Sequence, residues 1–128
     1  VPLDTARVTT ALDLGGGAGA FAVSLTKRYG MQVVAVSRDW GDLPFMTTIA
    51  AKGVIGVQAD MLRRLPFVDG AFDMLHSSQS GLRFTGTLAM LEAFVYEMDR
   101  LVRPGGWLVH RSWFIEPGML GCRQELRF

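Results

Sequence analysis

A glycine-rich turn that directly follows a strand-like segment is the feature that most constrains the fold of this chain. Residues 7–14 (RVTTALDL) are β-branched and apolar and run into three glycines, which begin at Gly15 and end at Gly17. Residues 20–29 then carry apolar side chains at helical spacing, and Gly30 ends that pattern. A strand, a glycine turn and a helix in this order predict an α/β sheet whose first loop holds a nucleotide-like ligand, because glycine admits positive φ and a helix start offers unpaired N–H groups.

The same alternation of strand and helix patterns continues along the chain. Further strands are expected at residues 31–36, 54–59, 71–78 and 107–114, and further helices at residues 43–52 and 85–102. The strand segments are continuously apolar, which is typical of strands that are covered on both faces. The sequence therefore predicts a doubly wound, mostly parallel, Rossmann-like α/β sheet with about five strands, and a tight PGG turn at residues 104–106 before the last of them.

Length and composition limit the number of domains and the classes of ligand and partner that the chain can have. A chain of 128 residues is long enough for a single domain with a real core, so we expect one domain over residues 1–128. Its net charge of +1 gives no concentrated basic patch for nucleic acid, and no apolar run reaches the length of about 18–20 residues that spans a bilayer. Cys122 is the one cysteine, so no internal disulfide can form, which fits a reducing compartment. The spacing of the histidines, cysteine and acidic residues does not indicate a metal site.

Two ligand classes fit the glycine turn. Gly15, Gly17 and Ala20 match the G-x-G-x-x-G/A pattern of dinucleotide-binding loops, which would make the chain a nicotinamide-dependent oxidoreductase. Asp13 together with Gly15, Gly17 and Gly19 instead resembles the first motif of class I methyltransferases. Asp13 favours the second reading, because a carboxylate suits a ligand with an ammonium and a sulfonium group and repels a pyrophosphate. Asp13 could alternatively bond the amides of its own loop.

Three further segments extend the resemblance to class I S-adenosylmethionine-dependent methyltransferases over residues 10–114. Residues 56–78 (GVQADMLRRLPFVDGAFDMLHSS) are similar to that family's third-to-fourth strand segment, and residues 100–109 (RLVRPGGWLV) are similar to its helix, turn and fifth strand. Residues 43–53 (LPFMTTIAAKG) resemble a group of uncharacterised plant methyltransferase-like proteins. The resemblance implies S-adenosyl-L-methionine as cofactor and methyl transfer to a small-molecule acceptor whose identity the sequence does not give.

The resemblance also implies roles for individual residues. Asp60 takes the place of the carboxylate that accepts a hydrogen bond from the adenine amino group. The implied cofactor contacts are Asp13, Gly15, Gly17, Gly19, Asp60, Met61 and Ser77. His76 is the one candidate general base near the acceptor, although it could instead be a strand-end histidine bonded to a neighbouring backbone. His110 is expected to be structural, and the cluster of Glu97, Asp99 and Arg100 is expected to be a solvated helix face.

The chain departs from the family pattern at two places. Ser37 stands where most members have the acidic residue that holds the ribose hydroxyls, and Asp39 follows two residues later. Ser37 and Asp39 are therefore the ribose candidates, with capping as the alternative for Asp39, while Trp40 could cover the adenine or pack on the sheet. Residues 115–128 are too few for a helix and the family's last two strands. We therefore expect an incomplete domain, a fragment of a longer protein, with the fifth strand as an exposed edge.

These departures keep a second function class open. A methyltransferase-fold domain that lacks catalytic competence, retained as a remnant or for interaction with a partner, would share every motif described above. Methyl transfer and a non-catalytic role are thus the two main hypotheses that the sequence supports, with the nicotinamide oxidoreductase as a third.

Overall fold

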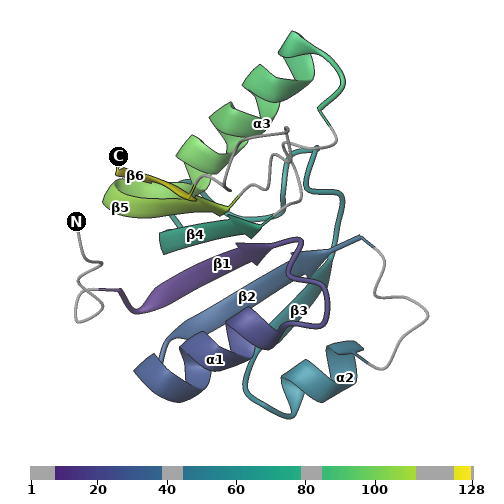
Figure 1. Cartoon of the computed structure of the whole chain (residues 1–128), viewed down its shortest axis with the longest axis vertical. Helices are drawn as coiled ribbons and strands as arrows, with labels where there is room; N and C mark the ends of the chain where they lie inside the picture. The colour runs from purple at the N-terminus through teal and green to yellow at the C-terminus, as the bar shows by residue number, and fades with distance from the viewer. Residues whose placement is uncertain (1–7, 39–44, 79–84, 112–122, 128) are drawn as a thin grey trace, which may run out of the picture.

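The computed structural model describes residues 8–38, 45–78, 85–111 and 123–127. Figure 1 shows the order of the elements along the chain. They are β1 (Thr10–Leu14), α1 (Ala20–Tyr29), β2 (Gln32–Ser37), α2 (Phe45–Ala50), β3 (Ile55–Gln58), β4 (Phe72–Ser78), α3 (Leu88–Leu101), β5 (Val102–Arg111) and β6 (Arg123–Arg127).

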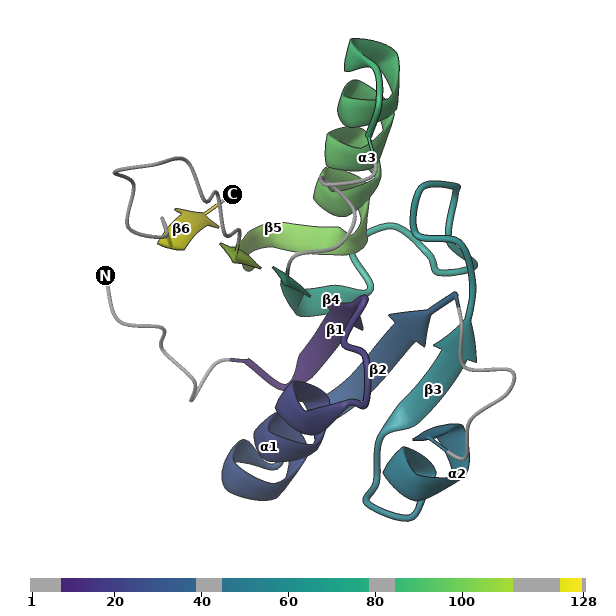
Figure 2. The same cartoon turned by 45° about the vertical axis from the view of Figure 1, so that its right-hand side comes forward.

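The strands form one sheet in the order β3-β2-β1-β4-β5-β6, and every pair from β3 to β5 is parallel. Helices α1 and α2 cover one face of the sheet, and α3 covers the other (Figures 1 and 2). The predicted doubly wound, mostly parallel α/β sheet is therefore confirmed. Strand β1 lies in its middle, between β2 and β4, which is where the chain reverses its direction of winding.

Two apolar cores result, one on each face of the sheet. Alternate residues of each strand point to opposite faces, so Ala11 faces α1 while its neighbour Leu12 faces α3. The core under α1 and α2 includes Ala22, Leu25, Val33, Ala35, Ile49, Met74 and Val109. The core under α3 includes Leu14, Val36, Leu75, Phe94, Met98, Leu101 and Leu108. Both faces of the central strands are thus covered, as the continuous apolar runs predict.

A carboxylate joins the start of β1 to the start of β4. Asp73 Oδ2 accepts hydrogen bonds from the backbone N–H and hydroxyl of Thr9, both at 2.8 Å, and from the backbone N–H of Thr10 at 3.0 Å. Arg103 donates to the other oxygen of the same carboxylate. Burial acts to raise the pKa of Asp73, but these donors outweigh it and hold that pKa well below its usual range.

Helix boundaries follow the sequence signals closely. Helix α1 spans the expected residues and ends at Gly30, whose N–H bonds the carbonyl of Thr26 at 3.0 Å. Helix α3 is shorter than expected at its start, because Thr87 caps it by accepting a hydrogen bond from the N–H of Met90 at 3.2 Å. A capping residue of this kind fixes the helix start more sharply than the apolar pattern does.

The expected start of the fifth strand at Trp107 was wrong. Strand β5 already begins at Val102, which pairs with Phe72, whereas Met74 pairs with Trp107. The PGG sequence therefore forms an irregularity inside the strand and not a turn before it. Gly106 is indispensable there, because a Cβ at that position would lie 2.7 Å from the carbonyl oxygen of Asp73.

The expectation that the fifth strand would be an exposed edge was also wrong. Strand β6 pairs with β5 in antiparallel orientation, from Trp107 with Arg127 to Arg111 with Arg123. The sequence of residues 123–127 gave no strand signal, because backbone pairing at the edge of a sheet does not require an apolar pattern.

Candidate functional site

The glycine loop joins β1 to α1 at the point where the strand order reverses. Gly15, Gly17 and Gly19 have φ of 69°, 55° and 76°, which is the left-handed region that side chains disfavour. The N–H of Gly15 also bonds the carbonyl of Val36 at 2.8 Å and so ties the loop to β2. The predicted glycines therefore have the backbone geometry that the loop requires.

The start of α1 is open to a ligand. Gly19 is its N-cap residue and provides no side-chain hydrogen bond to the first turn. Ile49 of α2 packs against Gly19, since a Cβ there would lie 2.7 Å from Cγ2 of Ile49. A Cβ at Gly17, by contrast, would have no atom of the described residues within 4 Å. Helix α2 thus packs against the loop at Gly19, whereas the described residues leave the position of a Gly17 Cβ unfilled.

Asp13 lies beneath this loop and is fully buried. Its Oδ1 lies 2.8 Å from Nδ1 of His76, and within the described residues its Oδ2 has no hydrogen-bond partner. A Cβ at Gly16 would lie 2.2 Å from Oδ2, so the carboxylate occupies the space under that glycine. Among the described residues Asp13 makes no hydrogen bond to the amides of its own loop, which was the alternative for this residue.

His76 is the neighbour of Asp13 on the adjoining strand β4. Its side chain is 2 % exposed, and its ring stacks on that of Phe21 in α1 with the centroids 3.8 Å apart. Nε2 is buried without a hydrogen-bond partner in the part of the chain that the structure describes. The hydrogen-bond partner of His76 is therefore a side-chain carboxylate and not a backbone group, and the imidazole lies between Asp13 and Phe21.

Ser77 and His110 form a second buried polar pair, on the face covered by α3. They are register neighbours on β4 and β5, close to the ends of both strands. The hydroxyl of Ser77 and both ring nitrogens of His110 have no hydrogen-bond partner among the described residues. Burial lowers the pKa of His110, and the nearby His76 adds to this effect, so the charged form of this imidazole is disfavoured.

The ends of β2 and β3 bring the other expected cofactor contacts to the same edge of the sheet. Ser37 is half-buried at the end of β2, and its carbonyl accepts from the N–H of Ala59 at 3.2 Å. Asp60 follows β3, accepts from the N–H of Leu62 at 3.0 Å, and lies 3.6 Å from Nε of Arg63. Met61 beside it is half-buried against the core under α3. Asp39 and Trp40 lie outside the described residues.

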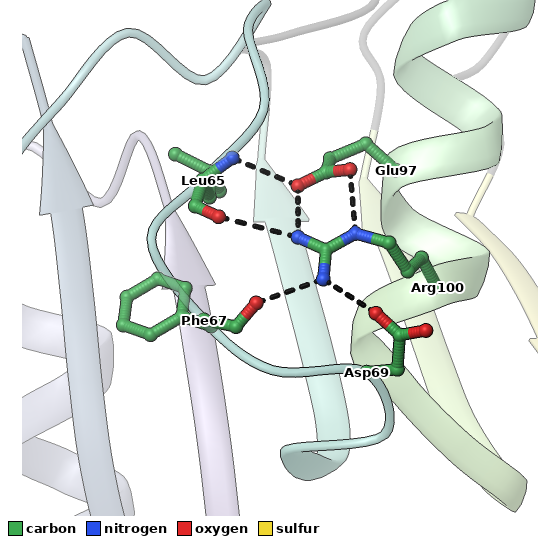
Figure 3. A network of polar contacts seen from close by, with 5 residues as sticks. All are labelled: Leu65, Phe67, Asp69, Glu97 and Arg100. Carbon is green, nitrogen blue, oxygen red and sulfur yellow. Dashed lines mark hydrogen bonds and ion pairs between the residues drawn. The ribbon is translucent and has the colours of Figure 1, made fainter.

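A buried arginine fixes the segment that leads from Asp60 to β4 (Figure 3). Arg100 of α3 donates from Nε to Glu97 at 2.8 Å, from its terminal nitrogens to the carbonyls of Phe67 at 2.8 Å and Leu65 at 3.2 Å, and to Asp69 at 2.9 Å. Glu97 in turn accepts from the N–H of Leu65 at 2.8 Å. We refer to these five residues as the Arg100 network.

The prediction of a solvated helix face was wrong for two of its three residues. Arg100 is 6 % exposed and Glu97 is 11 % exposed at their side chains, because residues 65–69 lie across this part of α3. The hydrogen bond with Arg100 lowers the pKa of Glu97, and the same bond raises the pKa of Arg100. Asp99 remains on the exposed side of the helix.

An open groove of about 480 Å³ lies beside this network, between the segment after Asp60 and the part of α3 from Ala89 to Glu97. It is lined by Leu62, Arg63, Arg64, Ala89, Glu92, Ala93, Tyr96 and Glu97. Within the described ranges the side chains form no cluster suited to a metal ion. The same ranges contain no helix that could span a membrane.

Sequence reasoning missed three contributors to the site. Gly16 leaves the space that the Asp13 carboxylate occupies, and the ring of Phe21 stacks on that of His76. Arg100 donates to Glu97 and to the carbonyls of residues 65–67. The helical pattern placed Phe21 on an apolar face, but nothing in it indicated a histidine as the neighbour. The spacing of three residues between Glu97 and Arg100 is compatible with an ion pair on one helix face, but it does not indicate that both side chains are buried.

Comparisons with known proteins agree with this geometry. The model of a family described as a methyltransferase domain matches residues 12–110. The probable pectin methyltransferase QUA3 of Arabidopsis thaliana is 34% identical over 110 residues, which is 85% of this chain and 18% of that protein. The chain spans about a quarter or less of the length of the plant relatives it matches.

Solved structures share the fold. The PH0226 protein of Pyrococcus horikoshii superposes with a TM-score of 0.69 at 25% identity, covering 83% of this chain and 50% of that one. The [4+2]-cyclase SpnF also has a TM-score of 0.69, at 23% identity, and covers 81% of this chain and 38% of that one. Together with the glycine loop at the switch point, the family match shows that the chain belongs to the class I S-adenosylmethionine-dependent methyltransferase domains.

Proposed function

We propose that this domain binds S-adenosyl-L-methionine at the edge formed by the ends of β1, β2 and β3, and transfers its methyl group to a small-molecule acceptor. The observation that carries the proposal is the glycine loop, which turns through left-handed conformations at Gly15, Gly17 and Gly19 and opens onto the uncapped start of α1. The family match supports the same cofactor.

The residues present fit the cofactor. The space beside Gly17 admits close approach of a ligand to the backbone, and the N–H groups at the start of α1 suit the carboxylate of the methionine part. Asp60 already orders its own turn through Leu62, and a carboxylate retains lone pairs that can accept from the adenine amino group. Ser37 offers a neutral hydroxyl at the ribose, where an acidic residue would bond more strongly.

Catalysis would then depend mainly on placement. The bound cofactor supplies an electrophilic methyl group, and the protein holds the acceptor in line with it and excludes water. Ser77 lies near the end of β4 and His110 near the end of β5, and both carry unpaired polar atoms within the described chain, so they are the side chains suited to bind an acceptor at this end of the two strands.

The acceptor itself has to be found by experiment. The names of two relatives refer to pectin and to 2-methyl-6-phytyl-1,4-hydroquinone, which are chemically unlike, so family membership supports methyl transfer without choosing an acceptor.

Calorimetric titration of the 128-residue chain with S-adenosylhomocysteine tests the cofactor assignment. We expect measurable binding to the natural sequence, and its loss in Gly17→Val and Asp60→Ala. Gly70→Ala serves as the matched control, since Gly70 also has positive φ but lies away from the loop. Absence of binding at high protein concentration would refute the cofactor assignment.

A non-catalytic role is the second candidate, and Ser37 is the observation that favours it. Cofactor binding without transfer of labelled methyl groups to acceptors in a fractionated metabolite extract would support that role. Transfer of label to any extract component would exclude it.

A further inference from the structure

We propose that His76 is a positioning residue for the cofactor: its imidazole holds the Asp13 carboxylate beneath the glycine loop and so keeps the loop in its ligand-accepting form. This inference rests on the proposed cofactor binding and adds a residue from β4 to it. It assigns His76 a role that depends on Asp13 and does not require contact with the acceptor.

The first support is the bond itself. Nδ1 of His76 lies 2.8 Å from Oδ1 of Asp13, and the two residues are register neighbours on adjoining strands, so the sheet itself sets their separation. A carboxylate oxygen accepts, so Nδ1–H is the donor. Both side chains are about 2 % exposed or less, which removes competition from water for this bond.

The second support is what the carboxylate would otherwise do. An aspartate next to a glycine turn readily bonds the amides of that turn, which would occupy groups that a ligand needs. Here Oδ1 is taken by His76, and within the described residues Oδ2 has no hydrogen bond. His76 therefore occupies one oxygen of the carboxylate, which the loop amides would otherwise bond.

The third support is the packing around the pair. The space under Gly16 is filled by Oδ2, and Phe21 in the first turn of α1 stacks on the imidazole at 3.8 Å. One chain of contacts thus links β4, β1, the loop and the start of α1. A change at His76 would reach both sides of the cofactor loop without touching the cofactor.

Burial argues against a direct catalytic role for the same side chain. His76 is 2 % exposed and its Nε2 is enclosed, with Phe21 over one face of the ring. A general base has to reach the proton that it removes. The geometry therefore fits positioning better than proton transfer.

Three variants of the full 128-residue chain test this inference, with S-adenosylhomocysteine as the probe. His76→Phe keeps a ring against Phe21 but loses the donor, and we expect at least tenfold weaker binding. His76→Asn can place an amide N–H where Nδ1–H stands, and we expect affinity within about threefold of the natural chain. His76→Gln, of similar polarity, reaches instead toward the position of Nε2, and we expect it to bind as weakly as His76→Phe.

Binding is measured by calorimetry well below the melting temperature of each variant, with near-ultraviolet circular dichroism confirming native packing. A purely structural role would make affinity follow melting temperature across the three variants, whereas positioning predicts rescue by asparagine alone. If His76→Phe does not fold, the comparison of His76→Asn with His76→Gln decides the question.

The outcomes separate this inference from the proposed function. If the natural chain binds the probe and all folded variants bind equally well, the positioning role of His76 is refuted while cofactor binding stands. If the natural chain does not bind, both proposals are refuted.

Discussion

Removal of the Arg100 guanidinium tests how far one buried side chain stabilises the segment between β3 and β4. Arg100→Met keeps the length and apolar stem of the side chain but deletes every donor. Glu97 then loses its charged partner while remaining 11 % exposed, and the carbonyls of Leu65 and Phe67 lose their hydrogen bonds. Breaking a buried ion pair from one side costs about 3–5 kcal/mol. The bond to Asp69 adds at most about 1 kcal/mol, because Asp69 is 78 % exposed.

We therefore expect Arg100→Met to lower the free energy of unfolding by about 3 kcal/mol or more, measured by urea denaturation with fitted m-values. Asp69→Asn is the matched control and should cost less than about 1 kcal/mol. The double variant Glu97→Leu with Arg100→Met removes the stranded carboxylate as well, so it should be more stable than Arg100→Met alone. A loss below about 1 kcal/mol for Arg100→Met would show that the network contributes little and that our reasoning is wrong.

Three further predictions concern the glycine loop, His110 and Glu97. Gly16→Ala should destabilise the fold by about 1–3 kcal/mol because its Cβ would meet Asp13, whereas Gly17→Ala should cost about 1 kcal/mol from backbone strain alone. Thermal melts in which Gly17→Ala is the less stable variant would contradict the packing of Asp13 under the loop. The lowered pKa of His110 means that the unfolded chain binds a proton that the folded chain does not, so stability should fall as the pH drops below about 6.5. In urea denaturation, His110→Phe should therefore show a smaller change in the free energy of unfolding between about pH 7.5 and 5.5 than the natural chain does. The lowered pKa of Glu97 gives stability that is complete above pH 4.5 and declines below it, and Glu97→Gln should remove that part of the acid response in the same assay.

The sequence predicts the fold well because its signals are local. The bounds of α1 follow from the glycines on either side and from the apolar spacing between them. The continuous apolar runs correctly predict a sheet that is covered on both faces. The start of β5 was wrong because PGG usually marks a turn, and here the strand pairs on both sides of it.

The site could be predicted only in part, because its contacts join distant residues. Asp13 and His76 were both candidates, but their pairing depends on the register of β1 with β4, which no local pattern carries. Glu97 and Arg100 were read as solvated because helical spacing does not show which loop covers them. The roles of Ser37, Asp60 and Met61 in cofactor binding remain predictions, and the titration of Asp60→Ala tests that of Asp60.

The position of β1 has a consequence for how the chain acquires its structure. Asp13 and His76 are 63 residues apart, and Thr9 and Asp73 are 64 apart, so the central strand pair closes the longest loop in the described sheet. Contacts of such sequence separation form slowly, because the entropy of loop closure must be lost before they contribute. During synthesis β1, α1, β2, α2 and β3 therefore emerge while one edge of β1, with its backbone N–H and C=O groups, stays unpaired until residues 72–78 follow. We expect this interval to be the stage at which the nascent domain most needs protection from aggregation.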